Sequence, residues 1–326
     1  MQNTKLIAFG EALIDFLSTK TNSDASHESF VKYPGGAPAN VAVAAARLGV
    51  NSHFVGQVGD DSFGRFLADC LAGYGVNTQG MRFSQEAKTA LAFVSLDDEG
   101  ERTFEFYRQA SADILYRAEY FESTWFNQSQ GIFHTCSNTL TDANISQATL
   151  AGMALASDAN WLISCDVNLR ANLWPDNAPN KERVIDWMMQ AHIIKASLEE
   201  LAELSDDPMA LIQQTLAHQA QVFVLTDGAK SVRYFTSSIT GEVATPKVDV
   251  KDTTAAGDAF VGGLLAQLIA KAPNVTACAE LDKSSWNDII AYAVASGACA
   301  VTEYGAYPAL PNQQQVSVML EKIRFT

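Results

Sequence analysis

Basic residues are scarce in this sequence of 326 residues. It has 22 Lys and Arg against 37 Asp and Glu, which gives a formal net charge of -15 at pH 7. A field of this sign repels nucleic-acid backbones and anionic lipid surfaces, so we expect neither a nucleic-acid nor a membrane partner. Histidine is also rare, and the five His residues form no ligand pair at helical spacing. Histidine-based metal binding is therefore not predicted.

The cysteine residues also show no pattern typical of a cross-linked or metal-stabilised fold. The five Cys residues include no CxxC pair, so neither a disulfide framework nor a zinc site is indicated. Only a short apolar run precedes Gly10, which does not fit a secretory signal, and we expect a cytoplasmic protein. The longest uncharged, weakly apolar stretch runs from Ile289 to Thr302 and is shorter than the about 20 residues that cross a bilayer. We expect it to be a buried helix.

The remaining composition is that of a globular protein. Hydrophobic residues make up 48% and charged residues 18%, with 9 Pro and 20 Gly, which excludes a disordered, collagen-like or coiled-coil chain. Apolar runs of strand length alternate with helical patterns. The predicted strands are KLIAFG, HFVGQVG, WLISCD, HIIKA and VFVLT, and the predicted helices are NVAVAAARLG, SFGRFLADCLAGYG, KERVIDWMMQ, SLEELAEL and PMALIQQTLAHQ. This order predicts a three-layer α/β/α sandwich around a mostly parallel sheet.

Two stretches break this alternation. Residues 89–108 predict a hairpin around DDEGE, with Phe104, Phe106 and Arg108 on one face. Near the start, LIDFL places Asp15 in another short strand. Both are predicted to form a small separate sheet, a lid that excludes water from a site at the mouth of the larger sheet.

Polar residues follow several of the predicted strands. Ligands of open parallel sheets bind beyond the carboxyl ends of the strands, so these residues are candidates for one site. Singly, each has a structural explanation: Ser197 as a helix N-cap, Asp227-Gly228 as a turn and Asp166 as a cap or loop residue. The candidates at this edge are Asp166, Asn168, Arg170, Ser197, Glu199, Glu200, Thr226, Asp227 and Gly228.

The segment KDTTAAGDAFVGGLL, residues 251–265, predicts an anion site. Small residues open a helix here, and the uncapped N–H groups with the helix dipole attract a phosphate. Asp258 in the first turn either complements the dipole or acts as a general base, and spacing alone does not decide between the two. Gly262 and Gly263 predict close packing against residues 291–300.

The segment PGGAPANVAVAAARLG, residues 34–49, has the groups that a polyol requires. Gly35 and Gly36 let a ligand approach the main chain, and Asn40 offers an amide from the following helix, although a simple glycine turn explains the pair equally well. A GxxxxGK[ST] P-loop is missing, and no GxGxxG follows the first strand. Any nucleotide is therefore bound by a motif other than these two.

The two segments together resemble the signatures of the ribokinase-like (PfkB) sugar kinases. These are Gly-Gly-x-x-x-Asn and Asp-Thr-x-Ala/Gly-Ala-Gly-Asp, and VGQVGDDSFG, FYRQASAD, DVNLR and TEYGAYPALP resemble family segments in the same order. The resemblance covers most of the chain and is greatest to bacterial fructokinases. It implies one ribokinase-like kinase domain over residues 1–326, with lid strands inserted at about 12–34 and 88–112.

The resemblance also implies roles for individual residues. Catalysis is implied for Asp258 as general base, for the backbone of Ala255, Ala256, Gly257 and Asp258 as anion hole, and for Arg170. Sugar binding is implied for Asp15, Gly35, Gly36, Asn40, Arg108 and Asp258. Nucleotide and phosphate binding is implied for Asn168, Lys195, Ser197, Glu200, Thr226, Gly228 and Gly257. Ser197 stands where the family has Asn, and Ala255 where many members have Gly.

The implied reaction is transfer of the γ-phosphoryl group of ATP to a hydroxymethyl group of a small sugar, first of all D-fructose. Mg²⁺ is implied at Glu200 through water, K⁺ at Asp252 and Thr254, and a homodimer through the lid. Two other kinds of function stay open at this point. One is a kinase for 2-keto-3-deoxygluconate or an aminoimidazole riboside, and the other is a non-catalytic sugar-binding regulator.

Overall fold

A large and a small β-sheet organise the protein. The computed structural model describes residues 4–18, 29–96, 102–127 and 130–324. Within these ranges the large sheet has nine strands in the order β13-β12-β11-β10-β9-β8-β1-β4-β5. They are β1 Lys5–Phe9, β4 Asn51–Gly59, β5 Asn77–Ser84, β8 Gly131–Cys136, β9 Leu162–Asp166, β10 Ile193–Ser197, β11 Val222–Thr226, β12 Val232–Phe235 and β13 Thr240–Val243.

The direction of the strands confirms the predicted mostly parallel sheet. All pairs from β5 to β11 are parallel, whereas β11–β12 and β12–β13 are antiparallel. The sequence interpretation identified β1, β4, β9, β10 and β11 but did not predict β5, β8 or the antiparallel pair. Strand β8, GIFHTC, is as fully buried as β9, but His134 and Thr135 interrupt the continuous apolar run that marks a buried parallel strand.

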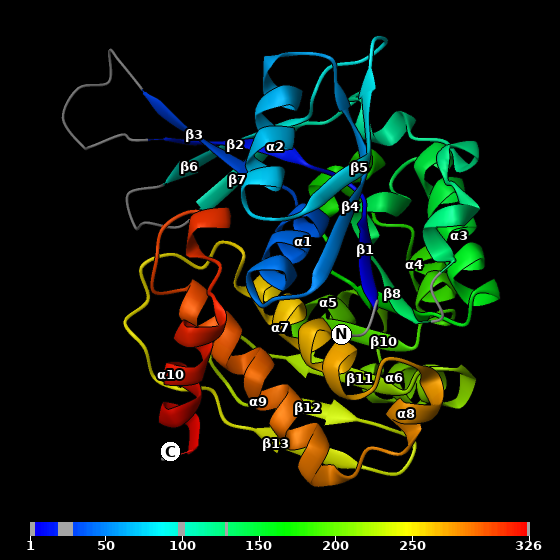
Figure 1. Ribbon diagram of the computed structural model, residues 1–326, viewed down its shortest axis with the longest axis vertical. Helices are drawn as coiled ribbons and strands as arrows, with labels where there is room; N and C mark the ends of the chain where they lie inside the picture. The colour runs from blue at the N-terminus through cyan, green and yellow to red at the C-terminus, as the bar shows by residue number, and fades with distance from the viewer. Residues whose placement is uncertain (1–3, 19–28, 97–101, 128–129, 325–326) are drawn as a thin grey trace.

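Helices cover both faces of the large sheet and complete the predicted three layers (Figure 1). Alternate strand residues enter opposite cores: Leu6 packs with one group of helices and Ile7 with the other. One face carries α1 Ala37–Arg47, α2 Ser62–Gly73, α7 Ala256–Lys271, α8 Val275–Ala279, α9 Lys283–Ala300 and α10 Gln313–Arg324. The other carries α3 Ala143–Asp158, α4 Lys181–Met188, α5 Leu198–Leu204 and α6 Pro208–His218.

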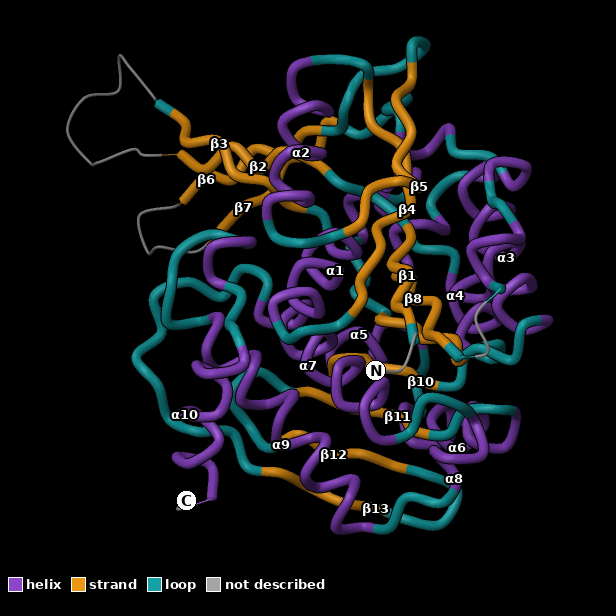
Figure 2. Tube along the Cα trace, in the orientation of Figure 1, coloured by secondary structure: helices purple, strands orange, loops and turns teal. Residues whose placement is uncertain are grey.

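The small sheet forms where the two irregular stretches were predicted to pair. Its order is β3-β2-β6-β7, with β2 Leu13–Ser18, β3 Phe30–Gly35, β6 Leu91–Leu96 and β7 Arg102–Tyr107. The predicted DDEGE turn lies outside the described residues. On β7, Phe104 and Phe106 are half-buried while Thr103 and Tyr107 are exposed, which confirms the predicted alternation. Helix α2 packs against strands of both sheets (Figure 2).

Helix α7 lies between α1 and α9, and glycines make this close packing possible. The predicted buried helix at 289–302 is the larger part of α9. A β-carbon at Gly263 would lie 3.2 Å from the Cα of Ala293 on α9, as expected. The prediction for Gly262 was wrong, because a β-carbon there would collide with Ala44 on α1. The period of the helix turns consecutive residues about 100° apart, so two adjacent glycines serve two different neighbours.

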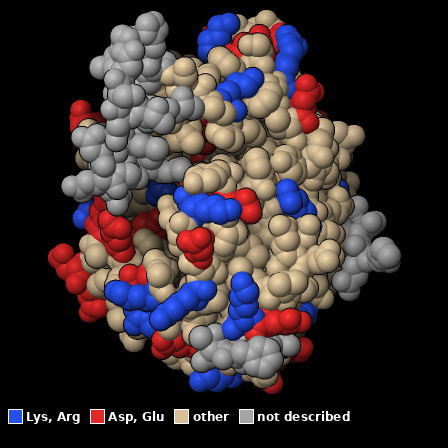
Figure 3. Space-filling model, turned by 90° about the vertical axis from the view of Figure 1, so that its left-hand side faces the viewer, with Lys and Arg blue, Asp and Glu red and all other residues tan. Residues whose placement is uncertain are grey.

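Both signs of charge occur on the surface. On the face shown in Figure 3, Lys and Arg side chains lie among Asp and Glu side chains and do not form a continuous basic stripe. Among the described residues, no helix has the length and apolar character needed to span a membrane.

Candidate active site

A cavity of about 620 Å³ lies beyond the carboxyl ends of β1, β8, β9 and β10 and reaches the small sheet and the start of α7. It is the place at which an open parallel sheet is expected to bind a ligand. Most of the residues singled out in the sequence meet here. Those that line the cavity are Asp15, Gly36, Asn40, Arg108, Asn168, Arg170, Lys195, Glu200, Asp252, Thr254, Ala255, Ala256, Gly257 and Asp258.

Asp258 lies at the centre of this arrangement, held by two amides. Its Oδ2 accepts a hydrogen bond of 2.7 Å from Nδ2 of Asn40, which α1 presents. Its Oδ1 lies 3.4 Å from Nδ2 of Asn168, which follows β9 in a left-handed conformation with φ 37°. The carboxylate is 7% exposed and lines the cavity. Its orientation is therefore fixed by residues from two distant segments.

Burial changes the protonation of this carboxyl group. Loss of solvent raises the pKa of Asp258 to about 7, assisted by the negative charge of Asp166 and opposed by the Asn40 hydrogen bond, Lys195 and Arg170. A base with a pKa near the working pH accepts a proton readily and is still partly ionised. Asp258 thus has the properties of a general base, a role that its sequence spacing left open.

The main chain at the start of α7, residues 255–258, has N–H groups that no described side chain caps, and it is called the anion cradle below. Ala255, its N-cap, has φ 57° and ψ 13°, and no side chain among the described residues caps the turn. The left-handed conformation costs a non-glycine residue about 1 to 2 kcal/mol, so the surrounding structure must hold Ala255 in place. A β-carbon at Gly257 would lie 3.5 Å from Nζ of Lys195. The helix N-terminus and an ammonium group therefore face the same point, as an anion requires.

Lys195 is a buried cation with one close carboxylate partner. Its Nζ donates a hydrogen bond of 2.9 Å to Oδ1 of Asp166 at the end of β9. Burial acts to lower the pKa of Lys195, but the charge of Asp166, followed by those of Glu200 and Asp258, outweighs it and raises this pKa. The side chain stays protonated and available to a phosphate.

Glu200 has a structural task in addition to its place in the cavity. Ser197 N–H donates to Oε2 of Glu200 at 2.7 Å, and Glu200 N–H donates to Oγ of Ser197 at 3.1 Å. This capping box confirms Ser197 as the N-cap of α5. Oε1 of Glu200 also accepts from Leu169 N–H at 3.1 Å and lies 3.9 Å from Nη1 of Arg170. Glu200 therefore orders the loop that carries Arg170.

The paired glycines make room for other groups of the site. A β-carbon at Gly35 would collide with the carboxylate of Asp15 on the neighbouring strand. Gly36 has φ 104°, and a β-carbon there would collide with the main chain of Glu11. Gly35 does not itself line the cavity, so its contribution is to leave space for Asp15. Only glycine satisfies both positions.

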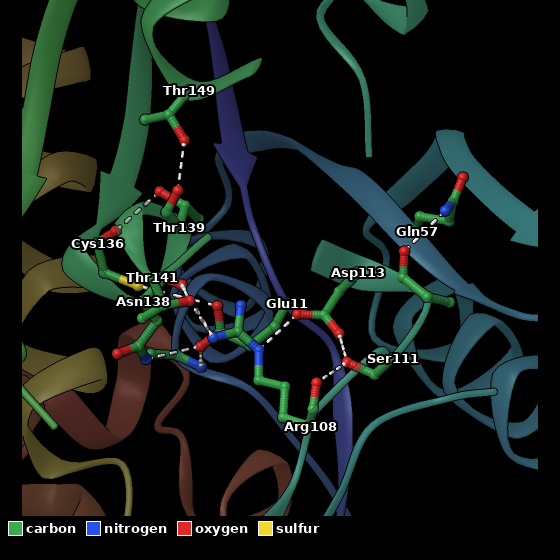
Figure 4. Close-up of polar contacts among 12 residues, drawn as sticks. Glu11, Gln57, Arg108, Ser111, Asp113, Cys136, Asn138, Thr139, Thr141 and Thr149 are labelled. Atoms are coloured by element: carbon green, nitrogen blue, oxygen red, sulfur yellow. Dashed lines mark hydrogen bonds and ion pairs between the residues drawn. The ribbon is translucent and has the colours of Figure 1, made fainter. Parts of the chain in front are cut away.

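Arg108 joins the small sheet to the main body. It follows β7 and is 5% exposed. Nε donates to Oδ2 of Asp113 at 2.6 Å, and Nη1 donates to the carbonyl of Asn138 at 2.9 Å and to Oγ1 of Thr141 at 3.2 Å. Figure 4 shows the guanidinium held between Asp113 on one side and Asn138 and Thr141 on the other.

Sequence reasoning missed several residues of the cavity. Glu11 lies 2% exposed after β1 and accepts from Nδ2 of Asn138 at 2.9 Å and from Ala37 N–H at 3.3 Å. Glu11 follows the predicted strand KLIAFG. The expectation that ligands bind beyond the carboxyl ends of the strands would therefore have identified it. Asn138 follows β8, which was not predicted. Phe104 and Phe106, predicted on the same hairpin face as Arg108, also line the cavity. Further missed lining residues are Leu13, Ala37, Leu173, Val250, Lys251 and Thr253.

Three predicted nucleotide residues are not brought into the cavity. Ser197, Thr226 and Gly228 are absent from its lining, although Ser197 and Thr226 are paired at the same edge of the sheet. Gly228 has φ 55°, and a β-carbon added to it would meet no heavy atom of the described residues within 4 Å, so it lies in an open turn. Their roles stay predictions.

The predicted monovalent-cation residues lie beside the anion cradle. Asp252 is buried, and it accepts from Thr254 N–H at 2.7 Å and from Gly305 N–H at 2.8 Å. Among the described residues, no group of three or more His, Cys, Asp or Glu side chains is arranged to hold a metal ion. A cation here would depend on main-chain or ligand oxygens as well.

A buried carboxylate beside an uncapped helix N-terminus is the arrangement of a phosphotransferase that activates an alcohol. The sequence model of the protein family described as "pfkB family carbohydrate kinase" matches residues 3–313 of this chain. The chain belongs to this family of carbohydrate kinases.

Similarity to individual proteins extends over nearly the whole chain. A probable fructokinase-7 of Arabidopsis thaliana is 41% identical over 98% of this chain and 94% of its own length. The structure of a Xylella fastidiosa fructokinase with bound ATP has 42% identity and a TM-score of 0.91, covering 97% of this chain and 98% of that one. A Vibrio cholerae O395 fructokinase bound to fructose, ADP and calcium ion has 33% identity and a TM-score of 0.84, covering 97% and 99%.

Proposed function

We propose that this protein is an ATP-dependent fructose kinase in which Asp258 is the general base. The observation that carries the proposal is the geometry of Asp258, a buried carboxylate with a pKa near 7, held beside the bare first turn of α7. Fructose as acceptor is supported by the similarity to a fructokinase described with bound fructose and ADP. A regulator that only binds sugar has no need of a tuned base.

The residues of the sugar end are suited to a polyol. Asn40, Arg108 and Asn138 each bury one side-chain polar atom that lacks a hydrogen-bond partner among the described residues. Such atoms are costly unless a ligand or water satisfies them. Asp15 and the main chain at Gly36 line the same end of the cavity. In the proposed complex they bind sugar hydroxyls, and the acceptor hydroxymethyl group points toward Asp258.

The chain's own groups then act in order. Asp258 takes the proton from the hydroxymethyl group as the oxygen of that group attacks the γ-phosphorus of ATP, and the bond from this phosphorus to the β,γ-bridging oxygen breaks to release ADP. A general base typically contributes roughly 10² to 10⁴ in rate. The N–H groups of the first turn of α7, residues 255–258, together with Lys195 and Arg170, face the transferred phosphoryl group and stabilise its developing charge. Closure of the small sheet, the proposed lid, excludes water that would otherwise accept the phosphoryl group.

ATP and metal ions fit the phosphate end of the cavity. Lys195, Arg170 and the cradle supply positive charge, and Asn168 lies between them and Asp258. Glu200 would hold Mg²⁺ through water, because its two oxygens already accept main-chain N–H groups, and the ion would supply neutralisation of the triphosphate charge. Asp252 and Thr254 would hold K⁺. Thr226, Gly228 and Ser197 are proposed to contact the nucleotide farther along the sheet edge.

A coupled ADP-release assay over a panel of sugars tests the proposal. D-fructose should give the highest kcat/KM, and fructose should raise the melting temperature further when a nonhydrolysable ATP analogue is present. Asp258→Asn should keep this ligand-induced shift while kcat falls by roughly 10² to 10⁴. Undiminished turnover in the Asn variant would remove Asp258 from the base role, and no sugar-dependent ADP release would contradict the kinase itself.

We also propose that the protein is a cytoplasmic homodimer that pairs through its small sheets. The outer face of this sheet carries a row of contacting aromatic rings, in which Phe93 touches Phe16, Phe30 and Tyr107 at centroid distances of 5.2 to 5.4 Å. Tyr107 is 56% and Phe30 37% exposed. Phe16 packs on Phe63 of α2, so the exposed part of this face lies at Phe30 and Tyr107, and it supports association with a second copy.

A further inference from the structure

The two ends of the cavity differ in charge. Toward the anion cradle lie Arg170, Lys195 and Lys251, against Glu200 and Asp252. Away from the cradle, the carboxylates of Glu11 and Asp15 and the guanidinium of Arg108 are the charged groups among the described residues that line the cavity, and Asp258 stands between the two ends. The selection of a neutral or an anionic sugar therefore depends on whether other groups of the protein compensate the positive charge of Arg108.

Arg108 is already compensated by the protein. Asp113 is 2% exposed and does not line the cavity; it lies behind Arg108 and pairs with its Nε at 2.6 Å. The hydroxyl of Ser111 lies 2.5 Å from Oδ1 of this carboxylate and 2.7 Å from the carbonyl oxygen of Arg108, so it can donate to either. Figure 4 shows the chain of contacts from Ser111 through Asp113 to the guanidinium.

A second carboxylate acts on the same cation from the cavity side. Glu11 interacts electrostatically with Arg108, which partly offsets the rise in the pKa of Glu11 that burial causes. Burial acts to lower the pKa of Arg108, but the charges of Asp113 and Glu11 outweigh it and raise this pKa. Arg108 is thus compensated by Asp113 in direct contact and by the electrostatic influence of Glu11.

We propose that Asp113 is a specificity-determining residue, which neutralises Arg108 from behind and thereby restricts the acceptor to uncharged sugars. Arg108 then offers a sugar hydroxyl a directed N–H group without offering a carboxylate a counter-ion. A sugar acid entering this end meets Glu11 and Asp15 and is repelled. The inference rests on the proposed sugar-kinase function and defines its substrate class.

The test is a comparison of Asp113→Asn with the unaltered protein. The amide can still accept from Nε of Arg108 and donate to Ser111, so the change removes charge and keeps shape. We expect the ratio of kcat/KM for 2-keto-3-deoxygluconate to kcat/KM for fructose to rise roughly ten- to hundredfold, the effect of one uncompensated charge a few ångströms from a bound carboxylate. Thermal shifts with each sugar give the same comparison without turnover.

Ser111→Ala is the matched control. It removes the hydrogen bond to Asp113 and leaves the charge, so the ratio should stay as in the unaltered protein even if both rates fall. If Asp113→Asn does not fold, Glu11→Gln removes the other compensating charge and should shift the ratio in the same direction. A folded variant in which both sugars lose activity equally would overturn the inference. Absence of fructose activity in the unaltered protein would instead contradict the proposed function.

Discussion

The protonation of one carboxyl group, Asp258, determines what the cavity can do to an alcohol. Each neighbouring group raises or lowers the pKa of Asp258. Desolvation raises the pKa, and the 2.7 Å hydrogen bond from Asn40 lowers it. Asn40 therefore orients the carboxylate and also increases the fraction of it that is ionised at neutral pH. Alone, neither the carboxylate nor the amide explains the site.

The pH dependence of kcat/KM tests the proposed role of Asp258. The base form of Asp258 is the ionised one, so kcat/KM for the sugar should rise with pH, level off above about 7 and fall about tenfold per unit well below it. Asn40→Ala removes a group that lowers this pKa, so its profile should move to higher pH. Initial rates at saturating ATP, from about pH 5.5 to about pH 9, measure both profiles.

Two results would contradict this account. One is a rate that does not change across the pH range in which Asp258 is expected to titrate. The other is an Asn40→Ala profile that moves to lower pH. A rate measured after return to neutral pH serves as the control for irreversible unfolding.

At the scale of elements, the separation of α1 and α7 sets the distance between Asn40 and Asp258. Gly262 allows the two helices to touch, since a β-carbon there would collide with Ala44 and lie 3.2 Å from the main-chain nitrogen of Ala45. Helix α1 is itself rich in Ala, which permits the same close approach from its side. The packing of two helices is thus part of the geometry of the site.

Gly262→Ala tests this relation. The added methyl group should force α7 away from α1, lower the free energy of unfolding by roughly 1 to 3 kcal/mol and reduce kcat by lengthening the Asn40–Asp258 contact. Denaturant unfolding and initial rates measure the two effects. Gly73→Ala at the end of α2 is the matched control, because no atom of the described residues lies within 4 Å of its β-carbon position. Equal behaviour of the two variants would show that α7 is not constrained by α1.

The sequence predicted the elements that have a clear local pattern. Strands β1, β9, β10 and β11, the hairpin of β6 and β7, and the helix that begins near Gly257 follow from periodicity and small-residue signals. Strand β8 does not, because His134 and Thr135 interrupt its apolar run, and Asn138, which follows β8, was therefore not identified. The partner of Gly262 and the position of Asp113 behind Arg108 depend on tertiary contacts that no local pattern encodes.

At the scale of the molecule, the cavity belongs to both sheets. The large sheet and α7 supply the proposed phosphate end, whereas the small sheet supplies Asp15 and, just past β7, Arg108. The face of the small sheet turned away from the cavity carries the aromatic row around Phe93. Pairing of two copies through this face would therefore act on the same sheet that lines the sugar end.

Tyr107→Glu tests the pairing. A charge in the middle of an apolar interface should disfavour it, so sedimentation velocity should show a dimer for the unaltered protein and a monomer for the variant. Val318→Glu on α10 is the matched control, since Val318 and Tyr107 are both 56% exposed. An unaltered protein that sediments as a monomer at all concentrations contradicts the proposed dimer.

The hydrogen bond between Asn40 and Asp258 joins residues 218 positions apart in the chain. During synthesis at about 5 to 20 residues per second, roughly 10 to 45 s pass between the emergence of the two groups. A nascent or truncated polypeptide that ends before α7 consequently has Asn40 but lacks Asp258, the proposed base. In the proposed mechanism, phosphoryl transfer therefore begins only after residue 258 has been synthesised and α7 has folded against α1.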